Sequence, residues 1–149
     1  MDRRALLIGS AAFGLLAACG PKGPGSVTIV AQGAAGMNLA TDGQDRPVIL
    51  QVIQMRGTGA FDSADYFALQ DPAKALGGDF VMVDQIAVAP GATAQKTITL
   101  DGATVAIAVI AGFLQPGNKA FRAKFPVSGA GTATFVVDLG PNGMSVAPK

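Results

Sequence analysis

ATVAIAVIAGF, residues 103–113, is the stretch of sequence that decides the fold class. Successive side chains of a β-strand point to opposite faces of a sheet. As a strand, this stretch places an apolar set on one face: Val105, Ile107, Val109, Ala111 and Phe113. The opposite face carries Ala106, Ala108 and Ile110. A strand that is apolar on both faces belongs between packed layers, so we predict that residues 103–113 form the most buried strand.

Short β-rich runs surround this stretch, and turn residues separate them at intervals of about ten residues, which is typical of an all-β sandwich. The predicted strands are Ser26–Gln32, Val48–Met55, Asp79–Val88, Ala94–Leu100, Ala120–Val127, Thr132–Leu139 and a weak final strand, Met144–Val146. The run Val48–Met55 is strongly apolar and is expected to be central. Ile98 and Leu100 are expected to face inward, and Asp101-Gly102 predicts a tight hairpin turn.

Between the second and third predicted strands, the pattern predicts a short helical insertion. Asp62 or Ser63 is suited to cap a short helix within Phe61–Leu69. A second helical turn is predicted over Asp71–Gly77, because Asp caps a helix, Pro suits its first position and Gly ends it. The predicted fold class is all-β: a two-sheet β-sandwich with a short helical insertion.

The composition excludes several classes of function. The 149 residues include no His and no Glu, and the single Cys is Cys19. Ser-His-Asp and Cys-His nucleophilic sites and the usual zinc sites are therefore excluded. A formal net charge of +1 without a basic run gives no attraction for nucleic acid. The Asp residues lack the spacing of a calcium loop, so no metal site is expected, and Arg122 and Lys124 are expected to form a solvated or edge-protecting stripe.

The amino-terminal residues have the layout of a signal peptide. Asp2-Arg3-Arg4 is followed by the uncharged residues 5–18 and then by Cys19. A membrane-spanning helix needs about 20 apolar residues, which disfavours an uncleaved anchor helix. Leu16-Ala17-Ala18-Cys19 resembles the lipobox of bacterial lipoproteins, which implies cleavage before Cys19 and lipidation of its sulfur. The expected organisation is a signal peptide at 1–18, a lipidated Cys and tether at 19–25, and a β-sandwich domain at 26–149.

The residue after the lipobox bears on where the protein is sorted. Gly20 stands where many lipoproteins retained in the inner membrane carry Asp, which implies the outer membrane with the domain facing the periplasm. Arg3-Arg4 is only a partial match to a twin-arginine signal. The export route, general secretory or twin-arginine, stays open.

Several segments, taken in order, resemble one known family. The segment from Asn38 to Met55 is similar to "N…G-R-P-x-P-V-V-V-R-V-Y-Q-L", and Phe61–Leu69 is similar to "F…A-D-F-F-A-L". Further matches are Leu76-Gly77-Gly78-Asp79, Ala89-Pro90-Gly91, Val109–Phe113 and Phe121-Arg122-Ala123. The chain departs from the family pattern at Gln51, Leu114 and Phe121. From Val27 to Val127 it resembles the TssJ (VasD) family, the outer-membrane lipoproteins of the type VI secretion system.

The resemblance implies a transthyretin-like β-sandwich with no catalytic activity and no cofactor beyond the lipid on Cys19. It also implies binding to the periplasmic C-terminal domain of the inner-membrane, IcmF-like protein TssM through loops at one end of the sandwich. Gly33–Pro47 is a long polar loop, and such loops are more often functional than the strands around them. Within it, our candidate partner-binding residues are Met37, Asn38, Asp42, Gln44, Asp45 and Arg46. The alternative for this loop is a solvated connector.

Two other functions remain as alternatives to a lipoprotein that binds TssM. A transthyretin-like scaffold would also suit a periplasmic carrier of a small ligand or metal, although the scattered Met residues are better explained as gap fillers in the core. An enzyme would need an Asp or Lys general base with a strongly shifted pKa, because the chain has neither His nor Glu.

Overall fold

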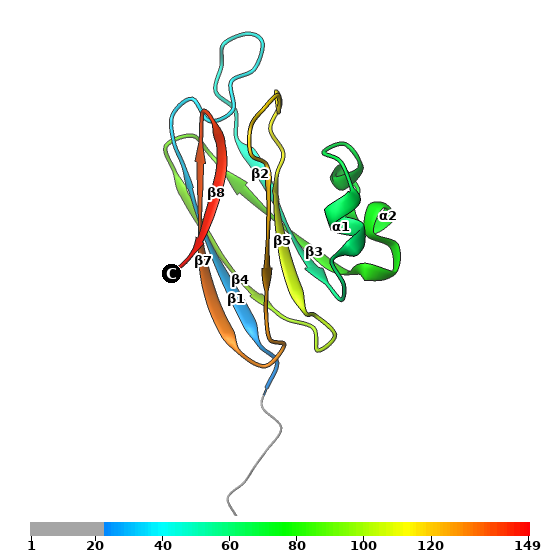
Figure 1. The fold of residues 1–149 in the computed structure, drawn as a ribbon. Helices are drawn as coiled ribbons and strands as arrows, with labels where there is room; N and C mark the ends of the chain where they lie inside the picture. Colours follow the sequence, from blue (N-terminus) through cyan, green and yellow to red (C-terminus); the bar gives the residue numbers. More distant parts are fainter. Residues whose placement is uncertain (1–22) are drawn as a thin grey trace, which may run out of the picture.

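The computed structural model describes residues 23–149, which form two packed β-sheets with short helices on one outer face (Figure 1). One sheet contains, in spatial order, β4 (Thr93–Thr99), β1 (Ser26–Gly33), β7 (Thr132–Gly140) and β8 (Gly143–Pro148). The other contains β3 (Phe80–Val88), β2 (Val48–Met55), β5 (Ala106–Ala111) and β6 (Arg122–Pro126). Neighbouring strands are antiparallel except β1 and β7, which are parallel. The predicted two-sheet β-sandwich is confirmed, while Cys19 and the predicted signal peptide lie outside the described residues.

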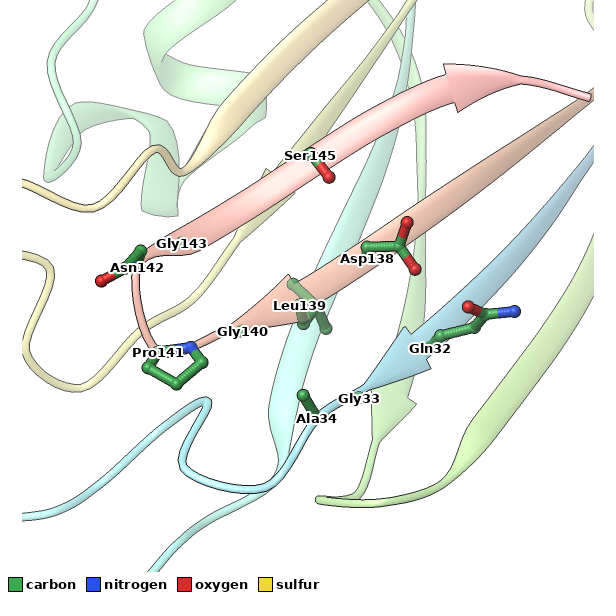
Figure 2. Close-up of a pocket in the computed structure, with 10 residues that line it drawn as sticks. All are labelled: Gln32, Gly33, Ala34, Asp138, Leu139, Gly140, Pro141, Asn142, Gly143 and Ser145. Carbon is green, nitrogen blue, oxygen red and sulfur yellow. The ribbon is translucent and has the colours of Figure 1, made fainter.

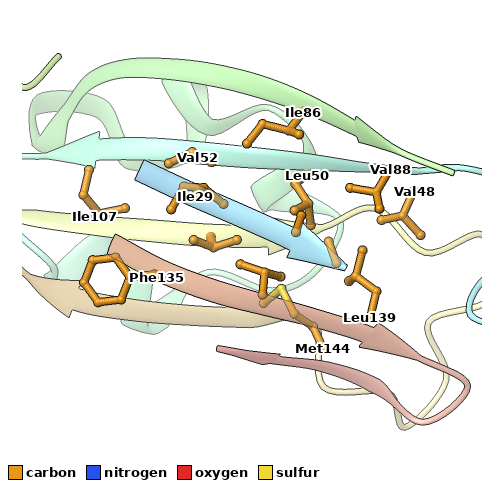
Figure 3. Packing of buried hydrophobic residues seen from close by; sticks show 14 of the residues in the cluster. Ile29, Val48, Leu50, Val52, Ile86, Val88, Ile107, Phe135, Leu139 and Met144 are labelled. Atoms are coloured by element: carbon orange, nitrogen blue, oxygen red, sulfur yellow. The ribbon is translucent and has the colours of Figure 1, made fainter. Parts of the chain in front are cut away.

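The main core lies between the two sheets, and β2 and β5 supply its centre. Every residue of β5 is buried, as the apolar pattern on both of its faces predicted. Ile107 packs between the sheets together with Ile29, Leu50 and Phe135 (Figure 3). The opposite face of β5 packs in a second cluster with the helical insertion through Ala106, Ala108 and Ile110. β2 lies between β3 and β5, so it is central in its sheet, as predicted.

The predicted strand over residues 103–113 begins later than expected. Val105 was predicted to lie within this most buried strand, but it is 51% exposed. The chain turns just before it, since the amide of Ala103 donates to Asp101 Oδ1 (2.8 Å) and that of Thr104 donates to Asp101 O (3.0 Å). Local hydrogen bonds of this kind compete with the sheet ladder, so β5 starts only at Ala106.

The turn at Asp101 joins the two sheets, and the predicted hairpin at this position is wrong. β4 pairs with β1, whereas β5 pairs with β2 and β6, so the two strands that flank the turn lie in different sheets. The buried side chain of Gln54 holds this crossing. Its Oε1 accepts from Asp101 N and Thr104 Oγ1, both at 2.8 Å, and its Nε2 donates to Thr99 O at 3.0 Å.

The helical insertion contains α1 (Gly59–Ser63), η1 (Ala68–Gln70), α2 (Pro72–Leu76) and η2 (Gly77–Asp79). The first helix starts earlier than predicted: it follows Thr58 and ends at Ser63, so neither Asp62 nor Ser63 caps its start. Asp65 instead begins the next turn, where its Oδ1 accepts from Ala68 N at 2.8 Å. Among residues 23–149, no helix is long and apolar enough to cross a bilayer.

The second predicted helical turn is confirmed as α2. The side chain of Asp71 accepts from Lys74 N at 3.4 Å, and Pro72 occupies the first turn. Gly77 ends the helix with a φ of +53°, a conformation that residues with a Cβ rarely adopt. The Asp, Pro and Gly signals therefore located this short helix correctly.

Arg122 and Lys124, on the edge strand β6, hold the insertion against the sheet. The Arg122 guanidinium donates to Phe61 O (3.2 Å) and Ala64 O (2.6 Å). Lys124 Nζ pairs with Asp62 Oδ1 at 2.6 Å. The stripe that was expected to be solvated or edge-protecting lies on an edge strand and also fixes α1.

Candidate functional site

Two long connections gather at one end of the sandwich, which we call the loop end. It contains residues 34–47 between β1 and β2 and residues 112–121 between β5 and β6. Figure 1 shows both projecting from this end, whereas the described chain begins at the opposite end. The loop end therefore points away from the side where the predicted tether enters the domain.

The carboxylate of Asp45 stabilises the fold of the first loop. Asp45 accepts hydrogen bonds from the backbone amides of Gly36 (2.6 Å) and Asn38 (2.9 Å). Leu39 and Asp45 form an isolated antiparallel bridge, and Ala40 N donates to Gln44 O at 2.8 Å. A loop with its backbone paired in this way presents a fixed surface, which lowers the entropy lost on binding a partner.

The tip of this loop carries an exposed ion pair. Asp42 Oδ2 accepts from the Arg46 guanidinium at 2.9 Å, and the two side chains are 50% and 49% exposed. The backbone amide of Gln44 donates to Asp42 Oδ1 at 2.9 Å. This amide lowers the pKa of Asp42, and the hydrogen bond and charge of Arg46 add to the effect, against a raising effect of desolvation. Asp42, Gln44 and Arg46 are all exposed.

Two of the predicted contact residues lie inside the protein. Met37 is 0% exposed and packs in the main core, and Asn38 is 1% exposed. Asn38 Nδ2 donates to Pro47 O (3.0 Å), and its Oδ1 accepts from Leu114 N (2.9 Å). Met37 and Asn38 therefore leave the set of candidate contact residues, because their side chains pack beneath the surface of the loop and do not face solvent.

The second loop is bound to the first and adds apolar surface. Gln115 Nε2 donates to Leu39 O at 3.1 Å, and Lys119 Nζ donates to Met37 O at 3.4 Å. Leu39 is 46% exposed and Leu114 is 57% exposed. Neither leucine was among the predicted contact residues. The sequence shows only that each is an apolar residue within a polar loop, and this indicates a binding surface only when the side chain is known to be exposed.

A surface groove lies beside the loop end, on the outer face of the first sheet. Gln32, Asp138 and Ser145 line it from the neighbouring strands β1, β7 and β8, and Gly140 and Pro141 close one end (Figure 2). Its lining combines polar side chains and glycines with the apolar residues Ala34, Leu139 and Pro141. Within residues 23–149, no three His, Cys, Asp or Glu side chains lie together as metal ligands would.

Known structures share this fold along nearly their whole length. Lipoprotein TssJ1 of the type VI secretion system from Pseudomonas aeruginosa is 28% identical, with a TM-score of 0.76 over 85% of this chain and 97% of that chain. Serratia marcescens Lip, described as a membrane-bound component of the type VI secretion system, is 24% identical, with a TM-score of 0.72 over 85% and 98%.

A third similar chain belongs to a structure described as "T6SS protein TssM C-terminal domain (869-1107) from EAEC". It is 20% identical, with a TM-score of 0.66 over 83% of this chain and 98% of that chain. At this identity the match shows the fold alone.

The sequence itself matches one family model across the domain. Among curated proteins, no sequence matches significantly. The family model for "Type VI secretion lipoprotein, VasD, EvfM, TssJ" matches residues 25–142, which include both loops of the loop end and strands β1 to β7 but not β8. The resemblance found in the sequence is thereby confirmed, and the chain belongs to this family of type VI secretion lipoproteins.

Proposed function

We propose that this protein is an outer-membrane-anchored structural lipoprotein of the type VI secretion membrane complex. In this proposal its loop end binds the periplasmic C-terminal domain of the inner-membrane, IcmF-like protein TssM, and the lipid on Cys19 holds it on the periplasmic face of the outer membrane. Membership of the family supports the lipoprotein role. The single observation that carries the partner site is the rigid, exposed loop end built on Asn38.

The surface of the loop end has the composition of a protein-binding site. Leu39 and Leu114 offer exposed apolar area on two loops that are joined by the Gln115–Leu39 hydrogen bond. Asp42 and Arg46 lie on the same loop as Leu39 and remain exposed. An apolar centre with a polar and charged rim is the usual anatomy of protein interfaces, where a few central side chains carry most of the affinity.

The predicted contact residues divide into two groups under this proposal. Asp42, Gln44 and Arg46 contact the partner, together with Leu39 and Leu114. The other predicted residues, Met37, Asn38 and Asp45, hold the loop in shape through burial and hydrogen bonds. The partner, TssM, is the one that the resemblance of the sequence to this family implies.

The test is a binding measurement between the mature protein and the periplasmic fragment of its cognate TssM. Wild-type protein is expected to bind, and the double variant Leu39→Ala with Leu114→Ala is expected to bind at least about tenfold more weakly. Phe67→Ala is the matched control, because Phe67 is 77% exposed but lies on the helical insertion. The proposal fails if wild type shows no binding, and the site assignment fails if Phe67→Ala weakens binding as much as the leucine pair.

A further inference from the structure

At the end of the sandwich opposite the loop end, backbone hydrogen bonds fix the start of the domain at Gly25. Gly25 O accepts from Leu100 N at 2.8 Å, and the next amide, Ser26 N, donates to Gly131 O at 2.9 Å. Gly25 is buried, and a Cβ placed on it would lie 2.5 Å from Gly131 O. No real side chain fits there without a shift of the backbone. The rigid domain therefore begins at Gly25, and only the residues before it can act as a tether.

The short tether limits how far this end can lie from the lipid. Five residues, Gly20–Pro24, separate Cys19 from Gly25. An extended chain spans at most about 3.6 Å per residue, so over the six steps from Cys19 Gly25 stays within about 22 Å of it. In the proposed function the lipid chains of Cys19 hold that residue at the membrane surface, so the end of the domain around Gly25 would be the part nearest to the bilayer.

Two loops cover this end, and we call them the end plate: residues 101–105 and 127–131. They pack together, since Val127 N donates to Val105 O at 3.0 Å and Gly129 lies against the backbone of Asp101 and Gly102. Asp101 is the only charged residue among the ten. The remaining surface consists of small or apolar groups, including Val105, which is 51% exposed.

Positive charge flanks the end plate. Arg56 is exposed and directly follows Met55, whose carbonyl accepts from Val105 N at 2.9 Å. Small and apolar groups with a flanking cation suit contact with a lipid surface that carries anionic headgroups. The exposed ion pair of the loop end, at the other end of the molecule, does not share this composition.

We propose that the end plate is the membrane-facing surface of the domain and rests on the lipid headgroups, so that the sandwich stands with its loop end directed away from the bilayer. This inference rests on the proposed lipidation of Cys19, but it does not depend on which protein the loop end binds. The tether is short enough to keep the end plate at the lipid surface without any strong affinity of its own.

The test uses the lipidated protein in vesicles of phosphatidylethanolamine and phosphatidylglycerol that carry a headgroup-attached spin-labelled lipid. The chain has no Cys besides Cys19, so an introduced Cys takes a fluorescent probe at one place only. A probe on Ala103→Cys, in the end plate, is expected to be quenched several-fold more strongly than a probe on Thr41→Cys, at the loop end. A probe on Ala130→Cys, in the second loop of the end plate, repeats the test if Ala103→Cys disturbs the turn.

The outcomes separate this inference from the proposed function. Equal quenching of the end-plate and loop-end probes in protein that sediments with the vesicles would overturn the orientation while leaving the anchor in place. Stronger quenching at Thr41→Cys would overturn it as well. Protein that fails to sediment with the vesicles would overturn both the anchor and the orientation. Failure of the protein labelled at Ala103→Cys to bind TssM would count against the partner assignment alone.

Discussion

The buried side chain of Asn38 accepts a hydrogen bond from the backbone amide of Leu114 at 2.9 Å and thereby joins two loops that are 76 residues apart in the sequence. The same side chain donates to Pro47 O at 3.0 Å, where the first loop enters β2. Asn38 is 1% exposed, and its side-chain amide bonds to both of these backbone groups. The shape of the loop end therefore depends on one side chain that a partner protein cannot touch.

Asn38→Ala is expected to lower the free energy of unfolding by about 1–3 kcal/mol, because the part-buried hydrogen bonds to Pro47 O and from Leu114 N are both lost. Chemical denaturation measures this loss, and binding to the TssM fragment is expected to weaken as the two loops separate. Asn142→Ala is the matched control, since Asn142 is exposed in the turn between β7 and β8. Equal stability of the two variants would contradict the role given to Asn38.

Arg122→Ala is expected to loosen the helical insertion and to cost about 1–2 kcal/mol of stability, because two carbonyls of the α1 region lose a charged donor. Hydrogen exchange in residues 59–70 measures the loosening. Asp62→Asn removes only the ion pair with Lys124, whose side chains are 50% and 41% exposed, and exposed pairs contribute about 0.2–1 kcal/mol. If Asp62→Asn increased exchange more than Arg122→Ala, the ion pair would be the main support of the insertion.

The features of the sandwich that follow from periodicity could be predicted from the sequence, and those that follow from distant partners could not. The alternation in residues 103–113 placed Ile107, Ala108, Val109 and Ile110 correctly, because a period of two fixes which face each side chain occupies. The turn at Asp101 was predicted, but not its direction. A short Asp-Gly turn suits a hairpin or a crossing, and the choice depends on Gln54, which is 47 residues away.

The candidate site shows the same division. Length and polarity located the loop between β1 and β2, yet they gave no information on which of its side chains are buried. Asn38 is polar and was expected at the surface, but contacts with Pro47 and Leu114 bury it. Leu39 was not among the predicted contact residues, although it is 46% exposed. Burial in a loop depends on tertiary contacts that local polarity does not report.

The loop tip is expected to respond to pH through Asp42. The pKa of Asp42 is lowered in the folded loop, first by the hydrogen bond from the Gln44 amide. The ionised carboxylate therefore stabilises the loop at pH values above about 3.9, the ordinary pKa of Asp in an unfolded chain. This stabilisation is lost as the pH falls through the pKa of the folded state. The Gln44 amide resonance should therefore titrate with a midpoint below 3.9 and stay constant from about pH 5 to 7. Asp42→Asn should abolish the titration, and a midpoint at or above the ordinary value would show that the hydrogen bond from Gln44 is absent in solution.

Cys19→Ser tests the anchor on which the position of the whole domain depends. One acyl chain binds a membrane only reversibly, and stable anchoring needs two or more, at about 0.8 kcal/mol for each buried CH₂. Loss of the thiol removes the attachment point, so the variant is expected to move from the membrane fraction to the soluble periplasmic fraction if its signal peptide is still removed. Ser26→Ala is a matched control at a half-buried residue of β1, within the described domain, and should remain in the membrane fraction. Mass spectrometry of the wild-type protein supplies the second measurement, because an unmodified Cys19 within an intact amino-terminal segment would contradict the lipoprotein assignment however the variant fractionates.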